Sequence, residues 1–220
     1  MCFSATASFT TAALTSVIGI VCLARTRDPR QWPLAAMPVF FALQQSLEGA
    51  LWLTLPVVAD AAIATDLTLV YLLFAQCFWP AYAPLAAAFT EPNDTRRRLM
   101  LACAGLGGAI SLYLLWGILA RSHTAGIDGG HIVYVTETPI PLALGFAYLA
   151  ATALPLLISS HRVVAWLGIV VLVGCVTAYL FYWTAFASVW CFFAAVASAL
   201  LLFHFEQARR QVHQILPSHG

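Results

Sequence analysis

The chain alternates between long apolar stretches and short polar breaks. A helix rises 1.5 Å per residue, so about 20 apolar residues cross the roughly 30 Å hydrocarbon core of a bilayer. We predict a transmembrane helix for each of seven such stretches, at residues 4–24, 33–55, 66–89, 99–119, 139–159, 163–183 and 187–205. The expected fold class is an all-α integral membrane protein, a seven-helix bundle at 1–205 with a cytoplasmic tail at 206–220.

Polar residues interrupt the second stretch at 41–53, FALQQSLEGALWL. Glu48 is the only charged residue in the interior of any long apolar stretch. On a helix, Gln44, Glu48 and Trp52 follow one another at intervals of four, and Gln45 precedes Glu48 by three, so all four share one face. An ionised carboxylate in lipid costs roughly 2.5–3.5 kcal/mol on insertion scales. We therefore expect this face to point into the bundle.

The composition agrees with a membrane protein. Hydrophobic residues make up 62% of the chain and charged residues 9%, against about 25% charged in soluble proteins. A net charge of +1 without a basic patch indicates no nucleic-acid partner. All ten basic residues are arginine, and the lack of lysine excludes a retinal or pyridoxal Schiff base. The six cysteines form no CxxC pair, so we expect no disulfide framework.

The arginines predict the orientation of the bundle. In the seven-helix arrangement Arg121 lies on one side, and the other nine lie on the opposite side: Arg25, Arg27, Arg30, Arg96, Arg97, Arg98, Arg162, Arg209 and Arg210. Arginine is retained in loops on the cytoplasmic side of a membrane. The amino terminus is therefore expected outside and the carboxyl terminus in the cytoplasm.

This orientation places several chemically interesting side chains at the outer end of the bundle, near Glu48, which lies about 9 Å below that edge. They are Cys2, His131, Tyr134, Trp190 and Cys191. Trp79 lies deeper, next to Pro80. Pro80 has no N–H to donate to the carbonyl of Gln76, so we expect a kink there, with Gln44 or Gln45 meeting the freed carbonyl.

The long break between the fourth and fifth stretches has its own pattern. Gly129 and Gly130 precede a β-prone run at 131–135, which predicts a small hairpin. Its backbone groups need partners, so we expect the 121–138 loop to be ordered over the outer end of the bundle.

Five segments together resemble an uncharacterised family of bacterial membrane proteins whose members begin Met-Cys-Phe-Ser-Ala. The segments are MCFSATASF, QQSLEGALW, FWPAYAP, HIVY and SVWCFFAA. The resemblance covers essentially the whole chain. It implies a multi-pass seven-helix protein of the bacterial cytoplasmic membrane, in contact with membrane lipid, and it supplies no activity.

Two sets of candidate site residues follow. A small-molecule, ion or proton site would use Gln44, Gln45, Glu48, Trp52, Trp79, His131, Tyr134 and Trp190. A divalent metal site would use Cys2, Glu48, His131 and Cys191. If Met1 is removed, Cys2 offers an amine and a thiolate to a borderline metal. None of these residues has a recognised metal-ligand spacing.

Three functions are compatible with the pattern. The first is a binding, sensor or transport-like protein that uses a polar site around Glu48. The second is a membrane-embedded metal-dependent hydrolase acting on a lipid or amphiphile, which needs three converging ligands and an open position. The third is a structural or assembly subunit whose polar face specifies helix packing. Hydrolase motifs such as H-E-x-x-H and G-x-S-x-G are absent from the sequence, so no known hydrolase signature supports the second function. Enzymatic and non-enzymatic functions both stay open.

Overall fold

The computed structural model describes residues 4–137, 140–181, 193 and 195–207, and these residues are mostly helical. They form seven helical rods, which confirms the number expected from the apolar stretches. In chain order the rods are α1 (Ala5–Arg25), α2 (Trp32–Thr54), α3 (Ala61–Leu72) continuing into α4 (Trp79–Thr90), α5 (Asp94–Ala120), α6 (Leu142–Leu157), α7 (Arg162–Phe181) and Ala195–Gln207.

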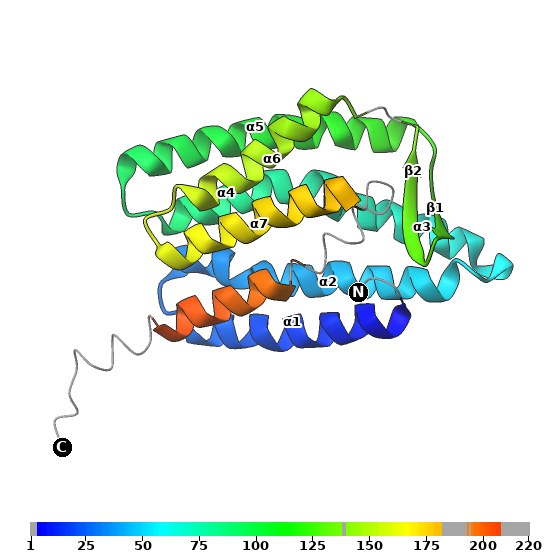
Figure 1. Cartoon of the computed structure of the whole chain (residues 1–220), viewed down its shortest axis with the longest axis horizontal. Helices are drawn as coiled ribbons and strands as arrows, with labels where there is room; N and C mark the ends of the chain where they lie inside the picture. The colour runs from blue at the N-terminus through cyan, green and yellow to red at the C-terminus, as the bar shows by residue number, and fades with distance from the viewer. Residues whose placement is uncertain (1–3, 138–139, 182–192, 194, 208–220) are drawn as a thin grey trace, which may run out of the picture.

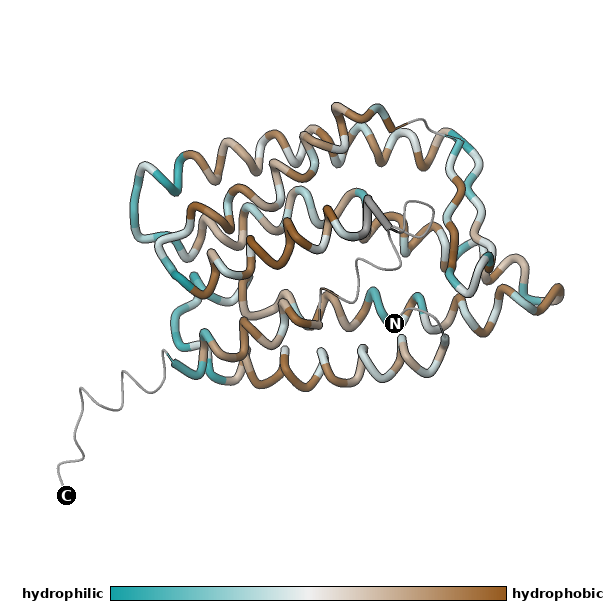
Figure 2. The backbone as a smooth tube through the Cα atoms, in the orientation of Figure 1, coloured by the Kyte–Doolittle hydropathy of each residue, from teal (hydrophilic) through white to brown (hydrophobic). Residues whose placement is uncertain are grey.

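The rods lie side by side along the long axis of the molecule (Figure 1). Their polar turns gather at the two ends, while the rods themselves are largely apolar (Figure 2). Arg25 and Arg96 belong to one end, where Arg25 pairs with Glu206 and Arg96 donates to the carbonyl of Ile158 at 3.1 Å. Arg121 caps the opposite end of α5. The structure thus separates these arginines between the ends as the sequence predicted.

Three rods are long and apolar enough to cross a membrane: Ala5–Arg25, Val58–Thr90 and Asp94–Ala120. Three others are apolar and shorter. Residues 187–192 of the predicted seventh helix, and the tight turn expected near 184–185, lie outside the described residues. The last described helix continues to Gln207, two residues beyond its expected end.

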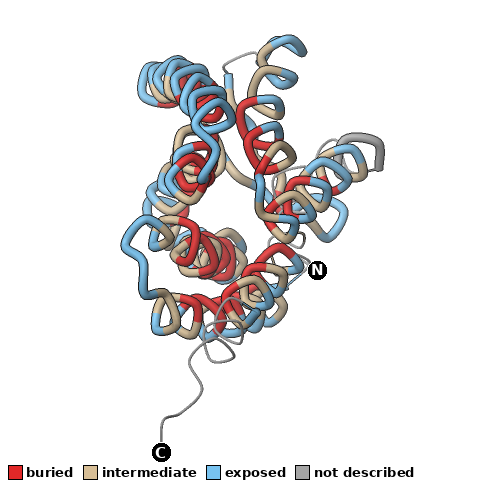
Figure 3. Tube along the Cα trace, turned by 90° about the vertical axis from the view of Figure 1, so that its left-hand side faces the viewer, coloured by how far each residue is buried: buried red, intermediate tan, exposed pale blue. Residues whose placement is uncertain are grey.

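Seen end-on, the buried faces of the rods turn toward one another and the exposed faces turn outward (Figure 3). The antiparallel helices α1 and α2 approach each other closely at two glycines. A Cβ on Gly19 would lie 2.5 Å from Cγ2 of Val39, and one on Gly49 would lie 2.9 Å from the Phe9 ring. This close packing holds one face of α2 against α1.

The third rod differs from its predicted bounds. It begins at Val58, eight residues before the expected start at 66, because the short 3₁₀ turn η2 (Val58–Asp60) leads directly into α3. The kink expected at Pro80 is a π turn, η3 (Leu73–Phe78), between α3 and α4. A π turn accommodates an extra residue within an otherwise continuous helix.

Neighbouring helices satisfy the carbonyls of this π turn. The Tyr148 hydroxyl of α6 donates to the carbonyl of Ala75 at 2.7 Å. The Ser111 hydroxyl of α5 lies 2.5 Å from the carbonyl of Cys77. The carbonyls on either side of Gln76 are therefore met from α5 and α6, while the expected bond from Gln44 or Gln45 to the carbonyl of Gln76 itself stays a prediction.

A β-hairpin joins α5 to α6, as predicted. Strands β1 (His123–Asp128) and β2 (His131–Thr136) pair antiparallel, with Asp128 opposite His131. The two turn residues, Gly129 and Gly130, have φ of 56° and 77°. A two-residue type I′ turn requires positive φ at both positions, which glycine adopts without strain.

The hairpin lies across α3, and the turn that joins α2 to α3 projects beyond it (Figure 1). Ile132 is fully buried and packs with Leu51 of α2 and Tyr71 of α3. The Tyr134 ring stacks on the Tyr71 ring with centroids 4.5 Å apart. The prediction that this loop is ordered and lies over the bundle is confirmed for its described residues, 121–137.

Candidate functional site

The polar face of α2 points into the bundle, as predicted. Glu48 is 0% exposed, Gln45 1% and Gln44 2%. Lipid or water along the outside of the molecule therefore cannot contact these side chains directly. Since burying a polar group is costly unless it is hydrogen-bonded, the arrangement of their partners decides what the site can do.

Two hydrogen bonds define this polar trio, Gln44, Gln45 and Glu48. The amide Nε2 of Gln45 donates to Oε2 of Glu48 at 3.0 Å. The indole Nε1 of Trp79 donates to Oε1 of Gln44 at 2.7 Å, which links α4 to α2. An indole nitrogen can only donate, so the oxygen of Gln44 faces Trp79 and its NH₂ group faces the opposite way.

The Trp79 ring is held in place by a second contact. It stacks on Phe41, with ring centroids 4.2 Å apart and an interplanar angle of 24°. Trp79 is buried, and Phe41 precedes Gln44 by almost one helical turn. One segment of α2 thus contacts both the face and the N–H of the indole.

Trp52, the fourth residue of the predicted face, lies in a neighbouring hydrophobic cluster. It is half-buried and packs with Leu51, Tyr71 and Ile132 beneath the hairpin. Its indole nitrogen is buried and has no hydrogen-bond partner among the described residues. It therefore remains a candidate donor at the outer edge of the site.

The hairpin residues divide between two faces. Side chains alternate along a strand, so His131 lies on the opposite face of β2 from Ile132 and Tyr134, which pack on the bundle. Burial lowers the pKa of His131 below its ordinary value.

His123 of β1 pairs with Thr136 and lies on the same face of the hairpin as Tyr134. Both ring nitrogens of His123 are buried without a partner in the described part of the chain. The sequence did not single out His123, although the strand period identifies its face once the register is known.

Ser8 is a second polar residue that we did not predict. It lies on α1, is 0% exposed, and its hydroxyl has no partner within the described ranges. The adjacent Phe9 contacts Gly49, the neighbour of Glu48 in sequence. An unpaired buried hydroxyl is uncommon, so α1 also contributes a polar group to the interior of the bundle.

The metal hypothesis receives no support from the described residues, among which no three His, Cys, Asp or Glu side chains converge as metal ligands. Of its proposed ligands, Cys2 and Cys191 lie outside the described residues, as does Trp190 of the ligand-binding set. Glu48 lies in the helical interior and His131 lies on the hairpin.

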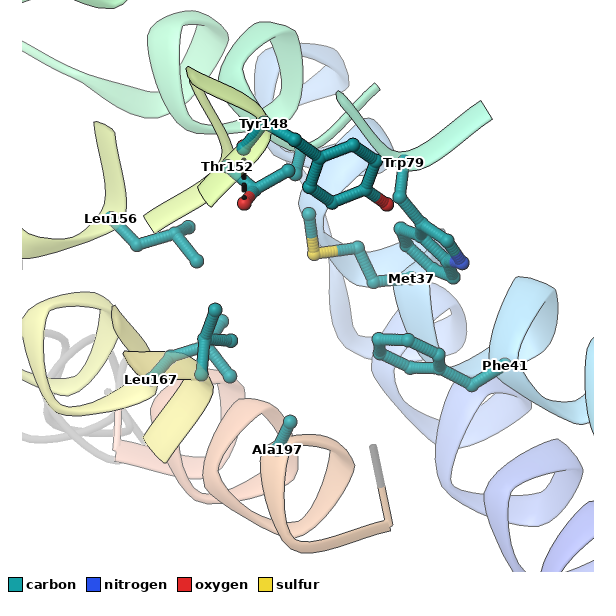
Figure 4. Close-up of a pocket in the computed structure, with 10 residues that line it drawn as sticks. Met37, Phe41, Trp79, Tyr148, Thr152, Leu156, Leu167 and Ala197 are labelled. Atoms are coloured by element: carbon teal, nitrogen blue, oxygen red, sulfur yellow. Dashed lines mark hydrogen bonds between the residues drawn. The ribbon is translucent and has the colours of Figure 1, made fainter. Parts of the chain in front are cut away.

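An apolar cavity lies on the other side of Trp79 (Figure 4). Its volume is about 450 Å³, including the space at its open side. It is lined by side chains from α2, α4, α6, α7 and the last helix: Met37, Phe41, Trp79, Ala83, Tyr148, Thr152, Leu156, Leu167, Val171 and Ala197. No sequence motif marks this cavity, because ordinary core residues from five distant segments form it.

A buried carboxylate at the arginine-rich end was also missed. Glu91, just after α4, is 3% exposed. Its carboxylate accepts from the Ser160 hydroxyl at 2.5 Å, the Ser160 N–H at 2.8 Å and the Asn93 N–H at 3.0 Å. Burial favours the neutral acid, but these bonds and the nearby His161 outweigh burial and lower the pKa of Glu91. Glu91 therefore joins the α4–α5 and α6–α7 turns, and in the sequence it looked like an ordinary loop residue.

Comparison with known proteins identifies a family. The sequence model of a family of unknown function (DUF6629) matches residues 1–215. No curated protein and no solved structure matches the chain.

Proposed function

The chain belongs to this family of unknown function (DUF6629), and from that premise we propose a function on the site alone. The protein is an integral membrane protein that binds a small molecule, ion or proton at the polar trio inside its helical bundle. It acts as a binding, sensor or transport-like protein of the cytoplasmic membrane.

The outer surface of the bundle supports insertion in a membrane. Large apolar side chains are exposed along the rods, including Val17 at 61%, Leu112 at 69% and Phe146 at 64%. Water-soluble proteins rarely expose contiguous apolar surface on this scale, whereas lipid tails would cover it. The arginine distribution supports an orientation with the amino terminus outside and the carboxyl terminus in the cytoplasm.

The observation that carries the proposed function is the complete burial of Glu48 in an apolar bundle. A carboxyl group inside a membrane protein is costly, and such residues commonly serve ion, proton or substrate pathways. Here the group lies within a set of directional donors and acceptors, because Gln45 donates to it and Gln44 is oriented by Trp79. These are the groups that a bound polar ligand would contact.

The other two hypotheses receive less support. A metal-dependent hydrolase needs three converging ligands, and the described residues contain no such group. A purely structural role for Glu48 predicts that the residue contributes to stability and responds to no solute. The following experiment separates that role from binding.

The test is a thermal-unfolding series on the detergent-purified protein and on Glu48→Gln. Midpoints are measured between pH 4.5 and 8, with sodium, potassium, ammonium or choline chloride at constant ionic strength, and with a total lipid extract. A ligand present at about 100 times its Kd stabilises a protein by about 2.7 kcal/mol. We expect at least one condition to raise the wild-type midpoint, and we expect Glu48→Gln to lose that response.

Glu91→Gln is the matched control, because it removes a buried carboxylate at the opposite end of the bundle. It should keep the response that Glu48→Gln loses, and the pH responses are compared above pH 6, because Glu91→Gln itself changes the pH dependence below pH 6. If wild type and Glu48→Gln respond alike to every condition, Glu48 is structural and the proposed function is wrong.

A further inference from the structure

One face of α7 is exposed and carries a single charge. The exposed side chains recur at intervals of three and four residues, which places them on one side of the helix. This α7 stripe consists of Arg162, Trp166, Ile169, Val173 and Val176, with Leu172 beside it. Its arginine lies where α7 begins, and every other member is apolar or aromatic. The stripe therefore has a cationic end and a long apolar remainder.

The length of the stripe matches one leaflet of a bilayer. Val176 follows Trp166 by ten residues, which is about 15 Å along a helix. This is about half of the roughly 30 Å hydrocarbon core. Tryptophan is enriched at the boundary between hydrocarbon and headgroups, and Trp166 is 60% exposed. With Trp166 at that boundary, Arg162 lies one turn away among the headgroups.

A second arginine reaches the turn from which α7 begins. Arg96 of α5 donates from Nη1 to the carbonyl of Ile158 at 3.1 Å and to the Ser160 hydroxyl at 3.3 Å. Ser160 precedes Arg162 by two residues. The α4–α5 and α6–α7 turns lie at the same end of the molecule (Figure 1). Arg96 and Arg162 therefore bring two positive charges to one turn.

These two charges are not neutralised by carboxylates of the described residues. Neither arginine forms an ion pair there. Glu91, the carboxylate that contacts the turn, accepts from Ser160 and Asn93 instead. The bonds of Arg96 use Nη1, which leaves Nε and Nη2 available. Guanidinium groups form paired, charge-assisted hydrogen bonds with phosphate, so a phosphate group suits this turn.

We propose that this surface binds one anionic phospholipid, with its phosphate at Arg96 and Arg162 and an acyl chain along the apolar part of the α7 stripe. A free phosphate would use the arginines alone, and an uncharged lipid would use the apolar side chains alone. The surface offers both, in the order in which a phospholipid presents its headgroup and its chain. The inference goes beyond the proposed function, because this site lies on the outside of the bundle and does not involve Glu48.

Native mass spectrometry of the full-length, detergent-purified protein tests the assignment. The probes are phosphatidylglycerol and phosphatidylcholine with identical acyl chains, and glycerol 3-phosphate provides a phosphate without a chain. The measured quantity is the Kd of the first bound lipid. We expect phosphatidylglycerol to bind more tightly than phosphatidylcholine, with a preference that shrinks as the ammonium acetate concentration rises. Glycerol 3-phosphate should not displace the lipid.

Variants at Arg162 test the position of the phosphate. Arg162→Gln should weaken phosphatidylglycerol binding about fivefold, the effect of one arginine at an anionic lipid surface, and should leave phosphatidylcholine binding unchanged. Arg162→Lys keeps the charge and should keep most of the preference. Arg96→Gln should also weaken the binding of phosphatidylglycerol, and circular dichroism checks its fold because the variant loses two bonds to the turn. Trp166→Ala should weaken both lipids alike.

Arg27→Gln is the matched control. Arg27 is exposed in the α1–α2 turn at the same end of the bundle, so this variant removes the same charge away from α7. It should leave the Kd of phosphatidylglycerol unchanged. An equal loss in Arg27→Gln and Arg162→Gln would show a diffuse attraction and overturn the site.

Three other results would also overturn the inference. They are equal affinity of the wild type for the two lipids, displacement of the lipid by glycerol 3-phosphate, and a dimer that Arg162→Gln dissociates, which would assign the stripe to a second copy of the chain. Glu48→Gln should bind phosphatidylglycerol as the wild type does. The outcome is therefore independent of the unfolding test of the proposed function.

Discussion

The close contact between α5 and α4 makes a quantitative prediction for Gly107→Ala. A Cβ at Gly107 would overlap the carbonyl oxygen of Pro80 and lie 2.6 Å from its carbonyl carbon. Carbon atoms in contact normally lie about 3.5–4.0 Å apart. The obstacle is main chain and not a flexible side chain, so the two helices must move apart to admit the methyl group.

The expected cost has two parts. Overpacking a well-packed interior costs about 1–3 kcal/mol. Separating the helices also disrupts the bond from Ser111 to the carbonyl of Cys77, which contributes about 0.5–1.5 kcal/mol. Against these, alanine is favoured over glycine in a helix by about 1 kcal/mol.

Gly105→Ala is the control, because it has the same helix propensity gain. Gly105 lies on the same helix, is exposed, and has nothing within 4 Å of its ideal Cβ. We expect Gly107→Ala to be less stable than Gly105→Ala by about 1.5–4.5 kcal/mol. Reversible unfolding in mixed micelles, followed by circular dichroism, measures the difference. Equal stability of the two variants would show that α4 and α5 are not in contact at Pro80.

Three further predictions concern the two carboxyl groups and the orientation. Glu48→Leu should lower stability by about 1–3 kcal/mol because it leaves the Gln45 amide without its acceptor, whereas Glu48→Gln should fold with nearly wild-type stability; equal losses would contradict a role beyond packing. The pKa of Glu91 is lowered in the folded protein, so its contribution to stability is present above the ordinary carboxyl pKa of about 4.3 and is lost as the pH falls through the lowered value. Glu91→Gln should therefore flatten the decline in unfolding midpoint between pH 6 and 3, and an unchanged decline would assign it to other groups. Reporter fusions should place the carboxyl terminus in the cytoplasm, and a periplasmic tail would reverse the orientation.

Features set by local chemistry could be predicted from the sequence. The spacing of Gln44, Gln45 and Glu48 identified a buried helical face because the helical period alone brings these positions together. Gly129 and Gly130 identified the hairpin because a type I′ turn needs positive φ at two successive residues.

Features that depend on distant contacts could not be predicted. Pro80 indicated a kink, but the π turn depends on hydroxyl donors from Ser111 and Tyr148, more than thirty residues away. The cavity is formed by common residues from five segments. Glu91 looked like a solvated loop residue until the fold brought Ser160 to it.

The π turn also determines which way Trp79 faces. Tyr71 and Trp79 stand on either side of the turn, and both pack on α2, Tyr71 with Leu51 and Trp79 with Phe41. At about 100° per residue, eight steps along a regular α-helix would separate the two side chains by about 80°. An extra residue accommodated in the turn reduces that separation to about 20°.

The turn therefore acts as a one-residue insertion that aligns two halves of a helix. Deleting a single residue from Leu73–Phe78 would leave seven steps of regular helix between Tyr71 and Trp79 and would keep their separation at about 20°. A regular helix of the present length would instead rotate Trp79 by about 100° relative to Tyr71. The indole would then lose its hydrogen bond to Gln44 and at the same time leave the cavity wall. The π conformation of this segment, and not only its composition, is therefore part of what specifies the site.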